Sequence, residues 1–595
     1  MIRFEHAGRT PPSLTTAAAL ALALSLGPGA APAAVLMHEG FHYSNGPLVP
    51  NGGWSAISSA GSKTVQVAAG KVVLQQSAGV GEDVSRAFPS QSAGASVFAA
   101  FFLTVPPGAI GTGTEYFAHF RQAVANNFRT RVAVGPGPAN PGDYGLYLQH
   151  GGTSPSFSWP VRLRFNVTYL IVTQYDGAAN LSRLWVNPVS SASPSISVSD
   201  VTPPVPLDSY GFRQASPVGA TFVEWIDELR VATTFADVYP VLDVVDLSGD
   251  ASDAAHPKLT RMEDGGLFAV WGRAGYRVAY SHSPGKGVNF SEPRLLDVPS
   301  RHPATIQTNN EVLLVAAVTH DLSSLRTGPG EITVGPVIAS VDPTDNAARP
   351  EFAKDAAAET THVVAIVWDA DSSVILYSQT SDDGATFKSA EAIGPSDGHV
   401  QWRPDIARYS YRVEAMWNCS ASPSEEWIMH TRTSVPNLFQ VPDRISAMGR
   451  RARDPQVSYA GPSTWDAVWI ELGVGGGPDS LVLATSSSDG VVYTKQFTVA
   501  IPALPGTARH TSMIRSADGA LHIAFDATVN GSIEVLYASI PSTRNAFSGP
   551  FILSGSPGAS TDPCVAIDVN GRPVFVWSEL IGGVRDIAFT RWLLP

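Results

Sequence analysis

Short runs of alternating apolar and polar residues fill the first part of the chain after residue 35. Gly, Pro and Asn clusters such as 135–142 separate these runs, and no segment holds a helical period over three turns. This alternation is typical of strands that bury one face. The runs lie at 97–103, 116–120, 144–148, 169–175 and 184–186. The pattern predicts an all-β fold with two sheets over 36–238.

A self-similar unit of about 50 residues recurs from residue 241 onward. Each unit opens with a polar residue followed by Pro, or by Thr in the sixth unit; the polar residues are His256, His302, Arg349, Arg403, Asp454, His510 and Asp562. An apolar strand follows about 14 residues later and ends in an aromatic residue in every unit but the second. A third strand and a weaker fourth strand complete the unit. Seven units of four strands predict a seven-bladed β-propeller.

The end of the last repeat indicates how the ring closes. This repeat stops after its third strand, at Trp592, whereas the segment 241–247 precedes the first repeat and has no place inside it. Propellers avoid an open edge by borrowing a strand from the other end of the chain. We therefore expect 241–247 to be the outer strand of the last blade, so that mixed termini close the propeller.

Charge and composition exclude several classes of function. The net charge is −13, and the longest basic run is Arg450-Arg451, which argues against a nucleic-acid partner or an anionic membrane surface. After residue 34, no stretch approaches the roughly 20 apolar residues of a membrane span. Two cysteines, Cys419 and Cys564, are too few for a disulfide framework, so we expect two free or buried thiols and no cysteine zinc site. The sequence has no phosphate loop and no dinucleotide fingerprint, so we expect no cofactor, and we assign no metal site.

The first 34 residues have the features of a secretory signal peptide. Arg3 and Arg9 precede an apolar run at 17–26, and 31–33 reads small-x-small. The predicted division is therefore a signal peptide at 1–34, a β-sandwich at 36–238 and a propeller at 241–595. We expect a secreted protein, extracellular or periplasmic, and the sequence leaves its oligomeric state open.

Motifs at both ends of the predicted sandwich resemble a known family. Glu39-Gly-Phe-His-Tyr43 and Asn51-Gly-Gly-Trp54 open it, and Trp225-Ile-Asp-Glu-Leu-Arg-Val231 closes it. This frame resembles the concanavalin-like (laminin-G-like) jelly-roll domains of secreted proteins. The resemblance implies that the first and last strands pair and that the domain is a glycan-binding or adhesive module. Because the two motifs lie at the ends of 36–238 and should pair, we expect this part to fold independently. Asp227 and Glu228 are either calcium ligands or a solvated edge pair.

A turn in the third repeat resembles a second family. Thr380-Ser-Asp-Asp-Gly-Ala-Thr-Phe387 matches the Asp-box of bacterial sialidase (BNR) repeats. In that family the motif is a structural turn, and we expect Asp382 to accept backbone N–H bonds across it. The resemblance supports a sialidase-like fold and carries no catalytic residue.

The polar residues that open the repeats are the candidate ligand-binding residues. The first residues of innermost propeller strands converge on one mouth of the central channel. The candidates are His256, His302, Arg349, Arg403, Arg453, Asp454, His510 and Asp562, with Trp402 as a stacking surface for a sugar ring. Cationic and titratable groups on an acidic protein favour a carboxylated or sulfated sugar. The alternative is that they only solvate the channel mouth.

Catalysis requires residues that the repeats supply incompletely. The resemblance to sialidases implies three arginines, a Tyr–Glu pair and an Asp acid/base. Arg349 and Arg403 lie one place closer to Pro than the arginine of that family's Phe-Arg-Ile-Pro motif, and Arg453 would have to be the third. Glu351 and Asp405 are the candidate carboxylate pair and Tyr409 the candidate nucleophile. We therefore expect a non-catalytic glycan-binding or adhesive protein whose partners are glycans or cell-surface carbohydrate. The alternatives are an exo-acting sialidase-like glycoside hydrolase that uses the sandwich as a carbohydrate-binding module, and a protein–protein scaffold.

Overall fold

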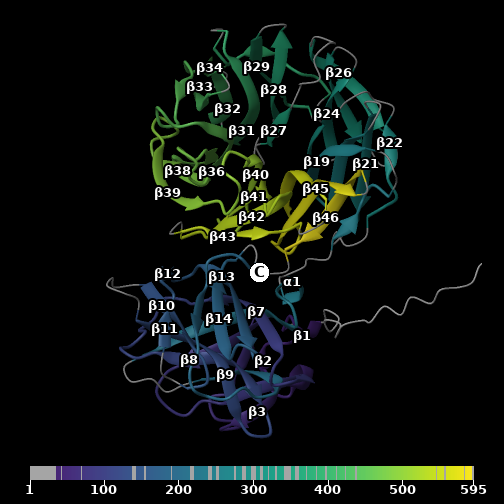
Figure 1. Cartoon of the computed structure of the whole chain (residues 1–595). Helices are drawn as coiled ribbons and strands as arrows, with labels where there is room; N and C mark the ends of the chain where they lie inside the picture. Colours follow the sequence, from purple (N-terminus) through teal and green to yellow (C-terminus); the bar gives the residue numbers. More distant parts are fainter. Residues whose placement is uncertain are drawn as a thin grey trace, which may run out of the picture.

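The chain is an all-β protein whose strands form two groups of sheets, one for each half (Figure 1). The computed structural model describes residues 35–592 except 42, 69, 137–142, 153–155, 189–190, 215–219, 239–243, 250–252, 274–276, 285–289, 297–302, 308–311, 319–320, 328–331, 341–349, 355–360, 370–371, 383–384, 396–397, 411, 423, 436–437, 544–545, 555–557 and 582. The predicted signal peptide therefore lies outside the described residues.

Two antiparallel sheets make up the N-terminal half. The first has the order β15 (Ile196–Val198), β14 (Leu181–Val186), β13 (Thr168–Asp176), β7 (Ser96–Thr104), β17 (Phe222–Ala232), β5 (Lys71–Gln76), β4 (Gln66–Ala68) and β2 (Gly46–Pro47), with β1 (Val35–Glu39) beside β17. The second has the order β11 (Ser156–Ser158), β10 (Asp143–Gln149), β9 (Asn127–Pro136), β8 (Glu115–Gln122), β16 (Leu207–Phe212), β6 (Asp83–Gln91) and β3 (Ser55–Ser58), with β12 (Leu163–Arg164) beside β10. A 3₁₀ turn, η1 (Asn51–Gly53), and a short helix, α1 (Phe235–Val238), complete this half. All five predicted strands are confirmed.

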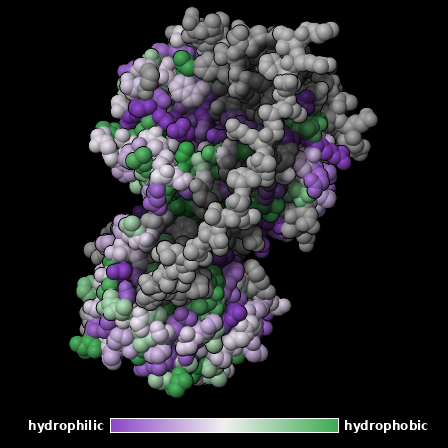
Figure 2. All heavy atoms as spheres, turned by 45° about the vertical axis from the view of Figure 1, so that its right-hand side comes forward, coloured by the Kyte–Doolittle hydropathy of each residue, from purple (hydrophilic) through white to green (hydrophobic). Residues whose placement is uncertain are grey.

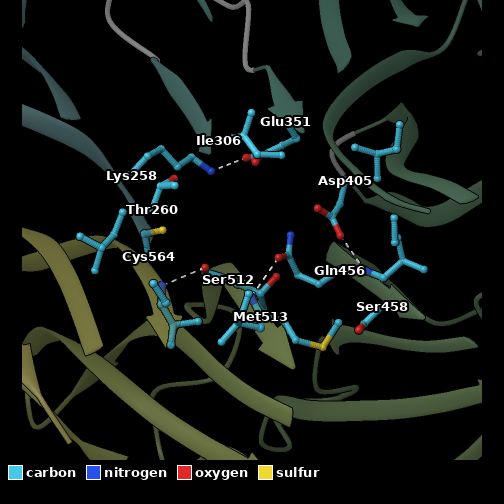
Figure 3. A pocket seen from close by; sticks show the side chains of 18 of the residues that line it. Lys258, Thr260, Ile306, Glu351, Asp405, Gln456, Ser458, Ser512, Met513 and Cys564 are labelled. Carbon is cyan, nitrogen blue, oxygen red and sulfur yellow. Dashed lines mark hydrogen bonds and ion pairs between the residues drawn. The ribbon is translucent and has the colours of Figure 1, made fainter. Parts of the chain in front are cut away.

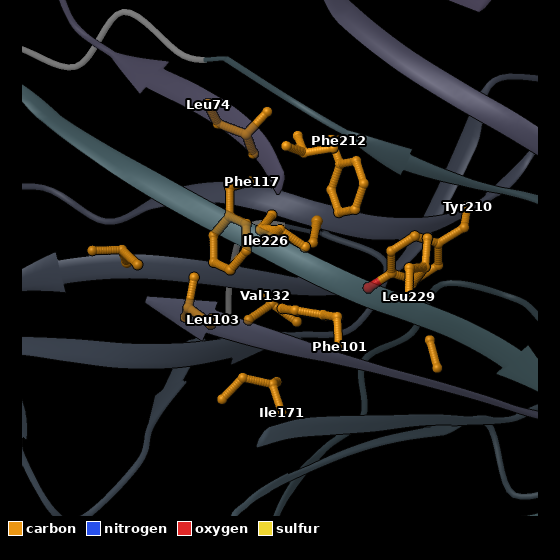
Figure 4. Packing of buried hydrophobic residues seen from close by; sticks show 14 of the residues in the cluster. Leu74, Phe101, Leu103, Phe117, Val132, Ile171, Tyr210, Phe212, Ile226 and Leu229 are labelled. Carbon is orange, nitrogen blue, oxygen red and sulfur yellow. The ribbon is translucent and has the colours of Figure 1, made fainter. Parts of the chain in front are cut away.

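One hydrophobic core joins the two sheets (Figure 4). Phe101 of β7 in the first sheet lies edge-on to Phe117 of β8 in the second, with ring centroids 6.1 Å apart. Tyr210 of β16 packs against the same Phe101 ring. The apolar positions of the alternating pattern therefore face inward from both sheets, which pack face to face.

The first and last strands pair, as the sequence predicts. β1 runs antiparallel to β17, with Glu39 opposite Leu229. The Glu39 carboxylate then joins the two opening motifs, since it accepts hydrogen bonds from Tyr43 Oη at 2.7 Å and Trp54 Nε1 at 3.1 Å. A Cβ on Gly52 would lie 1.6 Å from Tyr43 Oη, which explains the glycine there. These motifs are structural because they fix the entry of the chain into the sheet.

Small antiparallel sheets make up the C-terminal half, and Figure 1 shows them arranged around a common centre. The sheets are β19–β22 (Ala254–Arg261, Leu267–Arg273, Arg277–Ser283, Arg294–Leu296), β23–β26 (Ala304–Gln307, Val312–Val318, Asp321–Thr327, Ile332–Ser340), β27–β30 (Glu351–Lys354, Thr361–Asp369, Ser372–Thr380, Glu391–Ala392), β31–β35 (Val400–Tyr409, Arg412–Ser422, Glu425–Val435, Leu438–Phe439, Asp443–Arg444), β36–β39 (Ala452–Gly461, Thr464–Glu471, Ser480–Ser486, Thr494–Ala500), β40–β43 (Arg509–Arg515, Leu521–Val529, Ser532–Ile540, Ser548–Ile552) and β44–β46 (Ser560–Ile567, Pro573–Ile581, Val584–Arg591) with β18 (Val245–Asp246). Within the described residues, each predicted repeat thus corresponds to one sheet.

The last sheet takes its outer strand from the start of this half. β18 pairs antiparallel with β46, placing Val245 opposite Phe589. Leu247 follows at once and is buried in the core between the last and first sheets. Val245–Asp246 of the segment expected at this edge therefore occupy it, whereas 241–243 lie outside the described residues.

The outer face of the first N-terminal sheet packs directly on the C-terminal half. Phe102 of β7 contacts Phe551 and Trp592, with ring centroids 5.6 Å apart in both pairs. Both faces of β7 are consequently buried, which explains its nearly continuous apolar sequence. Thr168 N also donates to Ser548 Oγ across this junction at 3.1 Å.

The surface in Figure 2 mixes hydrophilic and hydrophobic residues over both halves. None of the helices in the described part of the chain is long and apolar enough to span a membrane.

Candidate functional site

The first strands of the C-terminal sheets surround a channel of about 710 Å³. Its wall contains residues of β19, β23, β27, β31, β36, β40 and β44. Figure 3 shows side chains from these strands converging on the channel interior. This volume is within the range of small-molecule sites.

A repeated backbone irregularity occurs where these strands begin. The residue before Pro, or before Thr511, has a positive φ in His256 (53°), Arg403 (51°), Asp454 (53°), His510 (59°) and Asp562 (54°). The strand register shifts at each of these points, which marks a β-bulge. Such conformations are uncommon for residues with a side chain. Their recurrence at equivalent positions means that the surrounding contacts hold them in place.

The Arg403 guanidinium on β31 is held by a nearly buried carboxylate on β36, the first strand of the next sheet. Arg403 Nε lies 2.9 Å from Asp454 Oδ1, and the Asp454 side chain is only 3% exposed. His510 N donates to Asp454 Oδ2 at 2.6 Å, and Asp454 N donates to Asn418 Oδ1 at 2.7 Å. Asp454 therefore links three neighbouring sheets and orients Arg403 at the mouth.

A second carboxylate lies between two histidines. Asp562 Oδ1 is 3.3 Å from His256 Nδ1 and 3.4 Å from His510 Nε2. Burial raises the pKa of Asp562, but His510, His256 and Arg403 outweigh that effect and hold it well below its ordinary value. His510 Nδ1 also lies 2.5 Å from Asp526 Oδ2, and burial raises the pKa of the Asp526 carboxyl. The cationic and carboxylate groups of the mouth thus form one connected network.

Polar side chains two residues further along connect three pairs of neighbouring inner strands, from β31 to β44 (Figure 3). Val457 N donates to Asp405 Oδ2 at 2.6 Å, and Met513 N donates to Gln456 Oε1 at 3.0 Å. Val565 N donates to Ser512 Oγ at 3.1 Å. These bonds satisfy backbone donors inside the channel wall and keep its shape rigid.

Three charged side chains, Lys258, Glu351 and Asp405, lie close together in the channel. Lys258 Nζ pairs with Glu351 Oε1 across the channel. Burial lowers the pKa of Lys258, but Glu351 outweighs burial and raises it overall. Burial and the nearby Glu351 raise the pKa of Asp405 to about 7. At neutral pH Asp405 can therefore hold or release a proton.

The structure brings together most of the predicted site residues that it describes. Those lining the channel are His256, Glu351, Arg403, Asp405, Asp454, His510 and Asp562. His302 and Arg349 lie outside the described residues. Three expectations are wrong: Trp402, Arg453 and Tyr409 are not among the lining residues.

Strand alternation at the bulges explains the first two differences. Trp402 packs into the hydrophobic cluster between the third and fourth sheets. Arg453 pairs with Glu426 at 2.8 Å. Tyr409 is 51% exposed and stacks on Tyr459, with ring centroids 3.9 Å apart.

Sequence reasoning missed Lys258 and Asp526. Lys258 has the same repeat position as Glu351 and Asp405, so comparing the second residue after each opening polar residue would have found it. Asp526 lies on β41, the second strand of its sheet, directly after Phe525. Asn418 follows Trp417 in the same way, and the two accept equivalent hydrogen bonds, from Asp562 N and Asp454 N. Comparing the residue after the aromatic in each repeat would have found it.

Other predicted features have structural roles. Asp382 accepts hydrogen bonds from Thr386 N at 2.8 Å and Thr380 Oγ1 at 2.6 Å, so it spans its turn as expected. Asp227 and Glu228 are 4% and 7% exposed, so the interpretation of a solvated edge pair is wrong; His38 lies 2.8 Å from Glu228. Both cysteines are buried, and neither forms a disulfide. Among the described residues, no three His, Cys, Asp or Glu side chains are arranged so that they could hold a metal ion.

Comparisons with known proteins give similarities of structure only. The structure is similar to NanB sialidase from Streptococcus pneumoniae, with 11% sequence identity, a TM-score of 0.34, and coverage of 84% of this chain and 97% of that one. A leech intramolecular trans-sialidase has 11% identity, a TM-score of 0.35, and coverage of 87% and 98%. An ulvan lyase of polysaccharide lyase family PL25 has 9% identity, a TM-score of 0.42, and coverage of 58% and 95%. No protein-family model and no curated protein matches the sequence. We draw no residue correspondence from these similarities.

Proposed function

We propose that this chain is a secreted, non-catalytic glycan-binding protein that recognises acidic sugars at the channel mouth. In this proposal residues 1–34 are a signal peptide, 36–238 form a concanavalin-like sandwich, and 241–595 form a seven-bladed propeller closed by mixed termini. Its partners in this proposal are glycans or cell-surface carbohydrate.

The repeated positive φ at the mouth is the observation that carries this proposal. Five equivalent residues from five strands hold a conformation that costs energy, and carboxylates cross-link them into one network. Backbone strain of this kind clusters at binding sites because the site gains preorganised geometry from it. If these polar side chains served only to contact water, holding them in one fixed arrangement would bring no benefit.

The chemistry of the network supports an acidic sugar. Arg403 contacts Asp454 through Nε, so the outer edge of its planar guanidinium is the donor pair suited to a carboxylate or sulfate. Asp454 and Asp562 supply acceptors for sugar hydroxyls beside it. The side chain of Arg403 is 20% exposed, so a ligand at the mouth can reach it.

Binding of 3′-sialyllactose, measured by calorimetry against lactose, tests the proposal. The protein should bind sialyllactose and not lactose, and the affinity should fall with added salt. Arg403→Ala should weaken binding by roughly tenfold or more, because losing one partner of a part-buried charge pair costs on the order of 2–5 kcal/mol. Arg451→Ala is the matched control, since Arg451 is bound to Glu426 outside the channel. Equal binding by wild type and Arg403→Ala would contradict the proposal.

One observation favours an exo-acting sialidase-like glycoside hydrolase instead. Asp405 has a pKa raised to about 7 and shares the channel with Glu351, which is held beside Lys258. Glycoside hydrolases use one protonated carboxyl as the general acid and one ionised carboxylate as the nucleophile or base. Asp405 would be the acid, and Glu351 the nucleophile or base. Release of the fluorophore from 4-methylumbelliferyl sialoside, abolished by Glu351→Gln or Asp405→Asn, would establish this alternative.

A further inference from the structure

A second cavity lies where the two halves meet. Its volume is about 210 Å³, and strands of both halves line it. At roughly 30 Å³ for each water of the liquid, this space equals about seven waters. It is large enough for one small ring and too small for an oligosaccharide.

Aromatic side chains form much of the cavity wall. Phe102 comes from the N-terminal half, and Tyr537, Phe551 and Trp592 come from the C-terminal half. The Trp592 ring stacks on Phe551, with centroids 5.3 Å apart, so the wall is fixed by packing. Trp225 of β17 also lines the cavity, and its side chain is 42% exposed, unusually high for a large apolar residue in a junction.

Polar groups surround this aromatic wall on both sides. Asp227 and Lys71 lie on the N-terminal side, and Lys71 Nζ is 5.7 Å from the centre of the Trp225 ring. Asp518 and His522 lie on the C-terminal side, and both are hydrogen-bonded to Ser516 Oγ, at 2.5 and 3.2 Å. The hydroxyl and amide side chains in the wall are Thr104, Asn166, Thr168, Ser516, Ser539, Ser542 and Ser548.

This combination indicates the class of ligand. Apolar ring faces beside hydroxyl, amide and carboxylate groups match the apolar face and the hydroxyls of a sugar ring. Two carboxyl side chains and one lysine give the cavity no excess of positive charge, so it does not favour a carboxylated or sulfated ring. We propose that the junction cavity is a second carbohydrate site that binds one uncharged pyranose ring, stacked on Trp225 and hydrogen-bonded to Asp518. This site is independent of the channel mouth.

Saturation-transfer NMR on the full-length chain, with the methyl pyranosides of glucose, galactose, mannose and N-acetylglucosamine as probes, tests this proposal. At least one of them should bind saturably, with a Kd on the order of 1 mM for a ligand of this size. Trp225→Ala and Asp518→Asn should each weaken that binding by roughly tenfold. Trp225→Phe should restore part of it, because a smaller ring face remains. Trp225 and Asp518 are both exposed, so these variants should fold.

Arg403→Ala separates this site from the channel. Under the proposal, Arg403→Ala leaves pyranoside binding unchanged, even if it abolishes binding of sialyllactose. Three results would overturn the proposal: no saturable binding of any of the four pyranosides, full binding by Trp225→Ala, or loss of binding in Arg403→Ala. A failure of sialyllactose binding would affect only the channel mouth.

Discussion

At the scale of single residues, the channel depends on contacts that sequence position does not reveal. The residue before each Pro could be selected from the repeats, because Pro removes a ladder donor and marks a break in the strand. Its partner Asp526 was missed because it comes from the second strand of the sheet, where it occupies the position after the aromatic that Asn418 occupies two repeats earlier. The bulge also places Arg403 on the channel and leaves Trp402 partly buried against the hydrophobic cluster between two sheets.

The raised pKa of Asp405 predicts a pH-dependent effect on stability. Its pKa is about 7 in the folded protein and 3.8 without the fold, so the folded state binds this proton more tightly. The stabilisation is complete below the unfolded pKa and is lost as the pH rises through about 7. Asp405→Asn keeps an acceptor for Val457 N and cannot ionise. Its Tm relative to wild type should therefore rise between pH 4 and 8, by the equivalent of on the order of 2 kcal/mol after allowing for partial exposure.

Asp382→Asn is the control for the sign of this effect. Burial raises the pKa of Asp382, but the hydrogen bonds from Thr380 and Thr386 together outweigh it and lower the pKa. This carboxylate therefore stabilises the fold above its unfolded pKa, and that stability is lost as the pH falls. The Asn variant should lose Tm at neutral pH and recover it in acid. Parallel Tm curves for wild type and Asp405→Asn from pH 4 to 8 would contradict the assignment.

Gly52→Ala should destabilise the protein more than Gly53→Ala. Both residues have positive φ, 55° and 82°. Placing an alanine in this left-handed conformation costs about 1–2 kcal/mol at either position. Only at Gly52 would the new Cβ collide with Tyr43 Oη and disturb the Glu39 hydrogen bonds; nothing lies within 4 Å of it at Gly53. Chemical denaturation should give a difference of several kcal/mol between the variants. Equal free energies of unfolding would show that Glu39 does not organise this corner.

At the scale of elements, strand positions were predictable and strand irregularities were not. Every second strand except that of the second repeat is an apolar run ending in Trp or Phe. The burial of those that the structure describes makes both the period and the residue types informative. The outermost strands, such as Glu391–Ala392, have exposed side chains and so carry little signal. At the start of the inner strands, each bulge contains a residue with a left-handed backbone conformation and interrupts the alternation of inward and outward side chains. The pattern of apolar positions in the sequence does not predict such a bulge.

The outer strand of the last sheet gives a prediction at this scale. Deleting 244–248 would remove β18, expose the hydrogen-bonding edge of β46, and uncover the core around Leu247. Exposed strand edges pair with other chains. The deletion variant should aggregate during size-exclusion chromatography, whereas Val245→Thr, which keeps the strand, should remain monodisperse. A monodisperse deletion variant with the Tm of wild type would contradict this role for the segment.

At the scale of the whole molecule, the junction makes the halves depend on one another. The sequence predicts that 36–238 folds independently, because its end motifs pair within it. In the structure, Phe98, Phe102 and Trp185 of this half are buried in a cluster shared with Phe551 and Trp592. The apolar runs in β7 and β13 do not distinguish burial against the second sheet from burial against the other half, so the sequence did not reveal this contact.

A fragment of residues 35–238 should therefore expose a large apolar face. We expect it to bind a hydrophobic dye such as ANS and to self-associate. Phe102→Ser together with Trp185→Ser in the fragment should reduce both effects. A wild-type fragment that is monomeric and does not bind the dye would show that the junction contributes little.

The central claim is that acidic sugars bind at the channel mouth, and a crystal structure of the protein soaked with 3′-sialyllactose tests it most directly. The predicted result is the sialic acid carboxylate within hydrogen-bond distance of the Arg403 guanidinium, with sugar hydroxyls near Asp454 or Asp562. A soaked crystal in which the ligand is fully occupied on the N-terminal sheets while the mouth of the channel is empty would contradict it.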